Sequence, residues 1–118
     1  MKLYAIRIFV DDWDKACDFY QKVLKLPLKF SDAAMGWAEF DVGGASFGIE
    51  RVDKNTDTKE KLVGRFLGVS LQVDDIQSKY EELKALGVEF TSPPEKQPWG
   101  GTLAHFKDPS GNTLTLLG

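Results

Sequence analysis

The chain repeats one short pattern, and that repeat limits the folds open to it more than any other feature. Residues 6–12 and 69–75 both end in Val-Asp-Asp, and each stretch is followed by apolar residues at helical spacing. In both stretches an Asp can cap the first turn of the helix that follows. The sequence therefore predicts two similar halves, each opening with a strand and a helix.

Two helices are expected from the spacing of apolar residues by three and four. The first spans about Trp13 to Leu24, and its apolar positions are Trp13, Ala16, Cys17, Tyr20, Val23 and Leu24. The second spans about Ile76 to Leu86, and Gly87 is a natural residue at which it ends.

Three strand-like stretches follow each helix. Gly43-Gly44 and Asp108 to Asn112 have the composition of tight turns between strands. The expected strands are Leu28–Ser31, Gly36–Val42, Ala45–Arg51, Val88–Thr91, Thr102–Lys107 and Thr113–Leu117. This order predicts one α+β domain of two βαβββ modules, about 1–51 and 64–118, joined by a polar linker at about 52–63.

Alternation along the strands separates an apolar face under each helix from a mixed face on the other side. On the first strand Tyr4, Ile6, Ile8 and Val10 are expected under the helix, and Arg7 faces away. A curved sheet with such a second face can form a cleft for a small molecule.

Composition excludes several function classes. The net charge of −3 and the pI of about 5.1 give no basic patch for nucleic acid. No apolar run has the length of a membrane span, and no secretory signal precedes the first strand. Cys17 is the single cysteine, so no disulfide can form within the chain. A cytoplasmic protein with no membrane or nucleic-acid partner is expected.

Three motifs resemble those of a known family. Residues 19–24, Phe-Tyr-Gln-Lys-Val-Leu, follow a strand that ends in Asp, and residues 98–101 and 108–112 read Pro-Trp-Gly-Gly and Asp-Pro-Ser-Gly-Asn. In this order they resemble the glyoxalase/bleomycin-resistance/dioxygenase superfamily, the vicinal oxygen chelate proteins. The resemblance implies an open, U-shaped mixed sheet around a site, helices on its outer face, and a homodimer.

The resemblance also implies where metal ligands would stand. These positions are Ala5 and Gly68 on the first strands and Glu50 and Thr115 on the last strands. Glu50 alone suits a hard divalent ion, and protein metal sites ordinarily need three or more ligands. No catalytic metal and no other cofactor is therefore expected.

Other side chains on the mixed faces are candidates for ligand binding. Trp37 and Trp99 can supply aromatic walls, and His105 or Glu50 could take part in acid–base chemistry. Structural interpretations compete with these: Glu50 pairs with Arg7, His105 is a half-buried strand residue, and Trp99 anchors the Pro-rich loop expected at Ser92 to Gly101. The full candidate set is Arg7, Trp37, Glu39, Glu50, Ser70, Gln72, Trp99, His105, Thr113 and Thr115.

Three functions remain in competition at this stage. The favoured one is a metal-free protein that binds a hydrophobic or aromatic small molecule in a Trp-lined cleft. The alternative is a lyase or dioxygenase-type enzyme of the same superfamily that uses Glu50 and His105, with or without a divalent metal. The third is a structural or regulatory module with no ligand.

Overall fold

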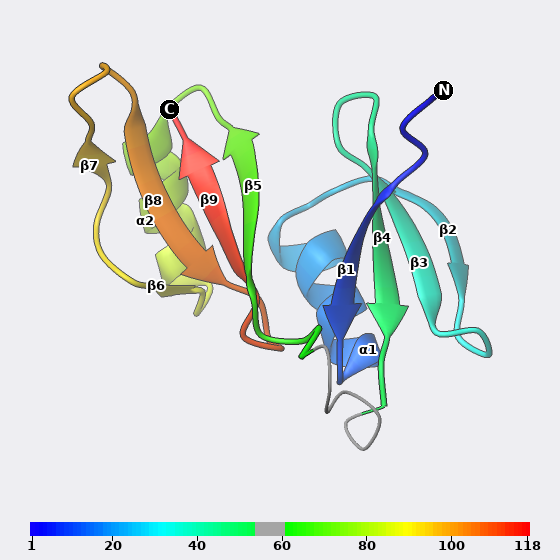
Figure 1. Cartoon of the computed structure of the whole chain (residues 1–118). Helices are drawn as coiled ribbons and strands as arrows, with labels where there is room; N and C mark the ends of the chain where they lie inside the picture. Colours follow the sequence, from blue (N-terminus) through cyan, green and yellow to red (C-terminus); the bar gives the residue numbers. More distant parts are fainter. Residues whose placement is uncertain (54–60) are drawn as a thin grey trace.

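The computed structural model describes residues 1–53 and 61–118, and its elements follow the predicted order (Figure 1). The predicted linker, 52–63, falls largely on residues 54–60, which lie outside the described residues. The α+β class and the repeated βαβββ order are confirmed. The elements are β1 (Ile6–Val10), α1 (Trp13–Asp18), the π-helical η1 (Phe19–Val23), β2 (Leu28–Asp32), β3 (Trp37–Asp41), β4 (Ser46–Arg51), β5 (Phe66–Gln72), α2 (Ile76–Ala85), β6 (Glu89–Phe90), β7 (Glu95–Lys96), β8 (Thr102–Lys107) and β9 (Thr113–Leu117).

The strands of the described residues form two mixed sheets. The first has the order β1-β4-β3-β2, and the second has the order β5-β9-β8-β6 with β7 also paired to β8. In each sheet the opening strand runs parallel to the last strand of its module, and the other pairs are antiparallel. Figure 1 shows the sheets side by side, with edge strands β1 and β5 toward the middle of the molecule.

Both helices begin and α2 ends as their sequences predict. The Asp12 carboxylate accepts from the backbone N–H of Lys15 at 3.2 Å, and Asp75 accepts from that of Ser78 at 3.1 Å. Gly87 follows α2 with φ of 92°, a conformation that glycine adopts without steric cost. Among the described residues, no helix has the length and apolar character needed to cross a membrane.

The second half of the first predicted helix is wider than an α-helix. The backbone N–H of Leu24 donates to the carbonyl of Phe19 at 2.9 Å, the i→i−5 bond of a π-helix. Phe19 and Tyr20 are consecutive, yet both are buried, with their rings in edge contact at 5.3 Å. The wide turn accommodates both rings in the core.

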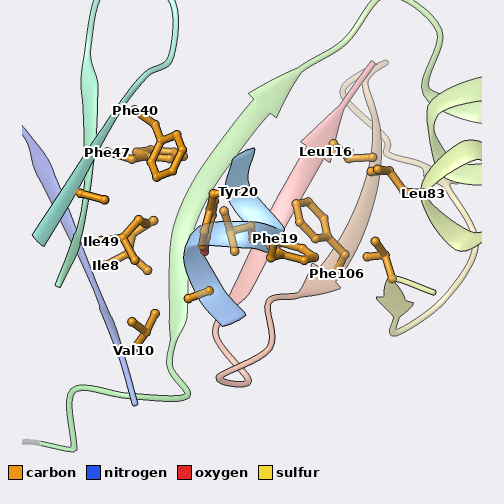
Figure 2. Packing of buried hydrophobic residues seen from close by; sticks show 14 of the residues in the cluster. Ile8, Val10, Phe19, Tyr20, Phe40, Phe47, Ile49, Leu83, Phe106 and Leu116 are labelled. Atoms are coloured by element: carbon orange, nitrogen blue, oxygen red, sulfur yellow. The ribbon is translucent and has the colours of Figure 1, made fainter. Parts of the chain in front are cut away.

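One hydrophobic core joins the two modules. Tyr20 is fully buried, and its ring lies 6.3 Å from that of Phe40 and 6.4 Å from that of Phe47 in the first sheet. Phe19 reaches the second sheet, 6.4 Å from Phe106. Figure 2 shows these rings around η1, so the helix of the first module packs against both sheets.

The turn between β8 and β9 ties the second module to that helix. The Tyr20 hydroxyl donates to Asp108 Oδ2 at 2.8 Å, and both residues are buried. Asp108 Oδ1 also accepts from the backbone N–H of Ser110 at 2.9 Å, which shapes the turn. Two of the motifs that carried the family resemblance are therefore in direct contact.

Asn112 is the second anchor of this turn and is completely buried. Its Oδ1 accepts from the backbone N–H groups of Gly64 and Arg65, at 2.9 and 3.1 Å. Its Nδ2 donates to the carbonyl of Phe9 at 2.9 Å and to Asp108 Oδ2 at 3.0 Å. One side chain thus connects the end of β1, the approach to β5 and the β8–β9 turn.

The sequence prediction differs from the structure at one further segment. Residues 92–101 were expected to be a loop, but Glu95 and Lys96 pair with Leu103 and Thr102 as strand β7. A stretch of two residues is too short to show the alternation that predicts a strand. Glu95 and Lys96 form one because the neighbouring strand β8 pairs with them.

Candidate functional site

The face of the four-stranded sheet that turns away from α1 carries a cluster of aromatic and charged side chains. The alternate face of the same strands packs under the helix, where Ile8, Ile49 and Phe40 are fully buried (Figure 2). The register therefore places the remaining side chains together on the opposite side. This aromatic face consists of Tyr4, Arg7, Phe9, Phe30, Trp37, Glu39, Gly48 and Glu50.

The Trp37 indole lies over Gly48, a glycine on the next strand. A Cβ atom at Gly48 would come within 2.1 Å of Trp37 Cη2, so only glycine leaves room for the indole. The indole Nε1–H donates to Glu39 Oε1 at 3.0 Å. The predicted alternation of Trp37 and Glu39 on one face is confirmed.

The Glu39 carboxylate accepts a second hydrogen bond from an aromatic side chain, that of Tyr4, which the sequence pattern predicts under the helix. The Tyr4 hydroxyl donates to Glu39 Oε1, so the expectation that Tyr4 lies under the helix is wrong. β1 begins only at Ile6, and the alternation of the strand does not extend to Tyr4. The hydrogen bonds from Tyr4 and then Trp37 hold the pKa of Glu39 below its usual value.

Arg7 and Glu50 form the predicted ion pair on the same face. Arg7 Nε and Nη2 donate to the two Glu50 carboxylate oxygens at 2.8 and 3.0 Å, a bidentate geometry. The hydrogen bonds to Glu50 raise the pKa of Arg7. The Arg7 guanidinium also lies 5.1 Å from the centre of the Phe9 ring.

His105 lies on the corresponding face of the other sheet. Its Nδ1 and Thr115 Oγ1 share a hydrogen bond of 2.8 Å, and its ring lies 5.7 Å from that of Phe66. No hydrogen bond, ion pair or ring contact within the described residues joins His105 to Glu50. The two candidate catalytic residues therefore stand on different sheets with different partners.

The remaining predicted residues are spread over the second sheet. Thr113 and Thr115 lie on β9, and Ser70 and Gln72 lie exposed on edge strand β5. Trp99 precedes β8, is 65% exposed, and lies so close over Gly101 that a Cβ there would be 2.1 Å from its ring. No hydrogen bond, ion pair or ring contact within the described residues links these side chains to the aromatic face.

A cavity of about 640 Å³ opens between the two modules, and two of the predicted site residues, Ser70 and Gln72, are among the residues that line it. Its walls are mostly apolar, with Leu24 and Leu26 on one side and Leu71 and Leu83 on the other. Of its charged groups, Lys79 is paired with Glu82 at 2.7 Å. The polar side chains along its mostly apolar walls are those of Asp41, Ser70, Gln72 and Lys79, so the cavity is a second place where a small molecule could bind.

The positions at which the resemblance implies metal ligands do not suit a divalent ion. Glu50 is engaged on both oxygens by Arg7, and Thr115 Oγ1 is bonded to His105. Gly68 has φ of 68°, a conformation in which a liganding side chain would be strained. Throughout residues 1–53 and 61–118, no three His, Cys, Asp or Glu side chains lie close enough together to hold a metal ion.

The two βαβββ modules and the mixed face of their sheets define the class of this protein. Comparison with known protein families identifies that class. The sequence model of the Glyoxalase/Bleomycin resistance protein/Dioxygenase superfamily matches residues 2–116, so the chain belongs to that family.

Sequence relatives and solved structures agree with this assignment. The chain is 32% identical to the uncharacterized protein YraH of Bacillus subtilis, over 98% of this chain and 97% of that protein. It is 29% identical to a bleomycin resistance protein of Klebsiella pneumoniae, over 90% of this chain and 83% of the relative.

Two solved structures are similar over nearly the whole chain. A superfamily member from Sphaerobacter thermophilus has a TM-score of 0.81 and 30% identity, covering 99% of this chain and 96% of its own. TnmS3, an antibiotic binding protein from Streptomyces sp. CB03234, has a TM-score of 0.76 and 28% identity, covering 98% and 93%.

Proposed function

We propose that this protein binds a hydrophobic or aromatic small molecule against the aromatic face, without a metal ion and without chemical turnover. The observation that carries the proposal is the arrangement of Trp37 and Glu39. The Trp37 indole lies over Gly48, and its N–H donates to the buried carboxylate of Glu39. A fixed ring with a polar group beside it suits recognition of a flat ligand.

The neighbouring rings extend this surface. Phe30 is 50% exposed and Tyr4 is 70% exposed, whereas large apolar side chains on a monomer surface usually occur singly. The similarity to a bleomycin resistance protein and to an antibiotic binding protein favours a ligand of that general kind.

The metal-free part of the proposal rests on the chemistry of the side chains. Ala5 and Gly68 offer no side-chain ligand, and Glu50 would have to leave a bidentate pair with Arg7 to bind an ion. The enzyme alternative gains nothing from the geometry, because Glu50 and His105 have separate partners on separate sheets.

We further propose that the protein acts in the cytoplasm as a homodimer in which a partner covers the aromatic face to complete the cleft. Edge strands β1 and β5 and the exposed side chains Phe30 and Phe66 support this arrangement. Sedimentation equilibrium tests the assembly. A mass of one chain at every concentration would contradict the dimer while leaving ligand binding at the aromatic face open.

The indole N–H signals in a ¹H–¹⁵N spectrum provide the test of binding. The chain has three Trp residues, and Trp37→Phe and Trp99→Phe variants assign the signals. Aromatic fragments that bind the aromatic face are expected to shift the Trp37 signal most. Trp13 is the internal control, because its buried indole donates to the carbonyl of Ile49 at 3.1 Å on the helix side of the sheet.

Two results would refute the proposal. One is a fragment set that shifts only signals around the intermodule cavity, for instance those of Leu71 and Leu83. The other is a stoichiometric divalent ion in elemental analysis that Glu50→Ala removes, which would revive the enzyme hypothesis.

A further inference from the structure

Glu39 lies at the centre of the aromatic face and is 8% exposed. Tyr4 and Trp37 both donate to the same carboxylate oxygen, Oε1. The register places Phe30 directly beside Glu39 on β2 and Gly48 beside it on β4. The Glu39 carboxylate is thus surrounded by the side chains of Tyr4, Phe30 and Trp37, and the Trp37 indole covers Gly48.

The second oxygen of this carboxylate is available to a ligand. In the described part of the chain, Glu39 Oε2 accepts no hydrogen bond, and no buried side-chain oxygen or nitrogen lacks a partner. Oε2 therefore reaches the surface. The two hydrogen bonds at Oε1 fix the carboxylate in one orientation, so no ordering of this side chain is needed when a ligand binds.

The other charges on this face are already matched. Arg7 and Glu50 neutralise each other in their bidentate pair. Lys29 acts on the Glu39 charge, but its ammonium donates to Ser46 Oγ at 3.0 Å and forms no ion pair with Glu39 within the described residues. Two further carboxylates on this side of the sheet, Asp32 and Asp41, lie at strand ends, where they accept from the backbone N–H groups of Ala34 and Gly44. Glu39 is thus the carboxylate at the centre of the face that can accept from a ligand.

From this geometry we infer that the aromatic face selects aromatic ligands that carry a protonated amine, with Glu39 Oε2 accepting from the ammonium group. The inference rests on the proposed function. Aromatic rings attract a cation through their π faces, and a carboxylate adds a charge-assisted hydrogen bond. An anionic ligand would instead meet the negative charge of Glu39 at close range.

Three probes with the same ring system test the selectivity: 2-naphthylmethylamine, 2-naphthylmethanol and 2-naphthoate. Affinities are measured by calorimetry at neutral pH, and the shift of the Trp37 indole signal reports where each probe binds. The amine is expected to bind about tenfold more tightly than the alcohol, because its hydrogen bond to Glu39 is charge-assisted. The naphthoate is expected to bind more weakly than both.

Glu39→Gln separates charge from shape. The amide oxygen can still accept from Tyr4 and Trp37, so the rings keep their places while the negative charge is lost. The amine should lose about tenfold in affinity, and the alcohol should be unchanged. Glu95→Gln, an exposed position on β7 in the other sheet, makes the same change in net charge and should leave all three affinities unchanged.

Equal affinity of the three probes, or an equal loss for amine and alcohol in Glu39→Gln, would overturn the inference and leave the proposed function standing. A preference for naphthoate would also overturn it. Failure of all three probes to shift the Trp37 signal would count against the proposed function itself, and the inference would fall with it.

Discussion

Replacing Tyr20 with phenylalanine removes one hydroxyl group from the buried contact between the two modules. The ring remains, so its packing against Phe40 and Phe47 is kept. The change deletes only the hydrogen bond to Asp108 Oδ2, which is 2.8 Å long. Hydrogen bonds to charged groups contribute about 1.5–3 kcal/mol to stability, and Asp108 is 5% exposed, so the full range applies.

This free energy converts into a measurable change in melting temperature. An unfolding entropy of about 2.1 cal/mol/K per residue gives roughly 0.25 kcal/mol/K for a chain of 118 residues. Tyr20→Phe should therefore lower Tm by roughly 6–12 °C in scanning calorimetry or thermal circular dichroism.

Tyr80→Phe is the matched control. Tyr80 is also a buried helix residue, at 8% exposure, but its hydroxyl accepts only from the Lys84 ammonium, at 3.3 Å, within the described residues. Loss of the Tyr80 hydroxyl should change Tm by no more than about 2 °C. If the two variants melt together, the Tyr20–Asp108 contact does not join the modules in the way the structure implies.

Alkaline pH gives a second readout of the same hydroxyl. Burial, and then the charge of Asp108, raise the pKa of Tyr20 well above its usual value. The folded state therefore retains the proton more tightly than the unfolded state, whose pKa is about 10. This contribution is complete below about pH 10 and is lost as the pH rises toward the folded value. The stability of the unmodified protein should fall more steeply above pH 10 than that of Tyr20→Phe.

Three further outcomes are expected. Asn112→Ala leaves the backbone groups of Gly64, Arg65 and Phe9 without their partner, at about 1–3 kcal/mol each, so urea denaturation should show a loss of roughly 3–9 kcal/mol. An unchanged midpoint would contradict the anchoring role of Asn112. Gly48→Ala should displace the Trp37 indole and shift its N–H signal with little effect on the midpoint, whereas an unmoved signal would show that the ring does not lie over Gly48. Burial raises the pKa of Cys17 to about 11, so at pH 8 a thiol reagent should label the folded protein far more slowly than the urea-unfolded chain; equal rates would contradict the burial.

The sequence alone determined the features that depend on near neighbours in the chain. The Asp caps of both helices, the stop at Gly87 and the apolar face under each helix all arise from contacts within a few residues. The Arg7–Glu50 pair was also predictable, because alternation puts both side chains on the same face once β1 and β4 are adjacent. The family motifs could be identified from the sequence. The sequence did not predict that two of them meet in the hydrogen bond between Tyr20 and Asp108.

Only the tertiary structure decided the composition of the aromatic face. Tyr4 donates to Glu39, which lies 35 positions away in the sequence, and no local periodicity of residues predicts such a contact. The place of Trp37 depends on a glycine in the neighbouring strand, and β7 exists because β8 lies beside it. These features follow from strand register and from which backbone groups meet across the sheet. A pattern read along one segment carries neither, because it records which face a side chain takes but not what lies opposite it.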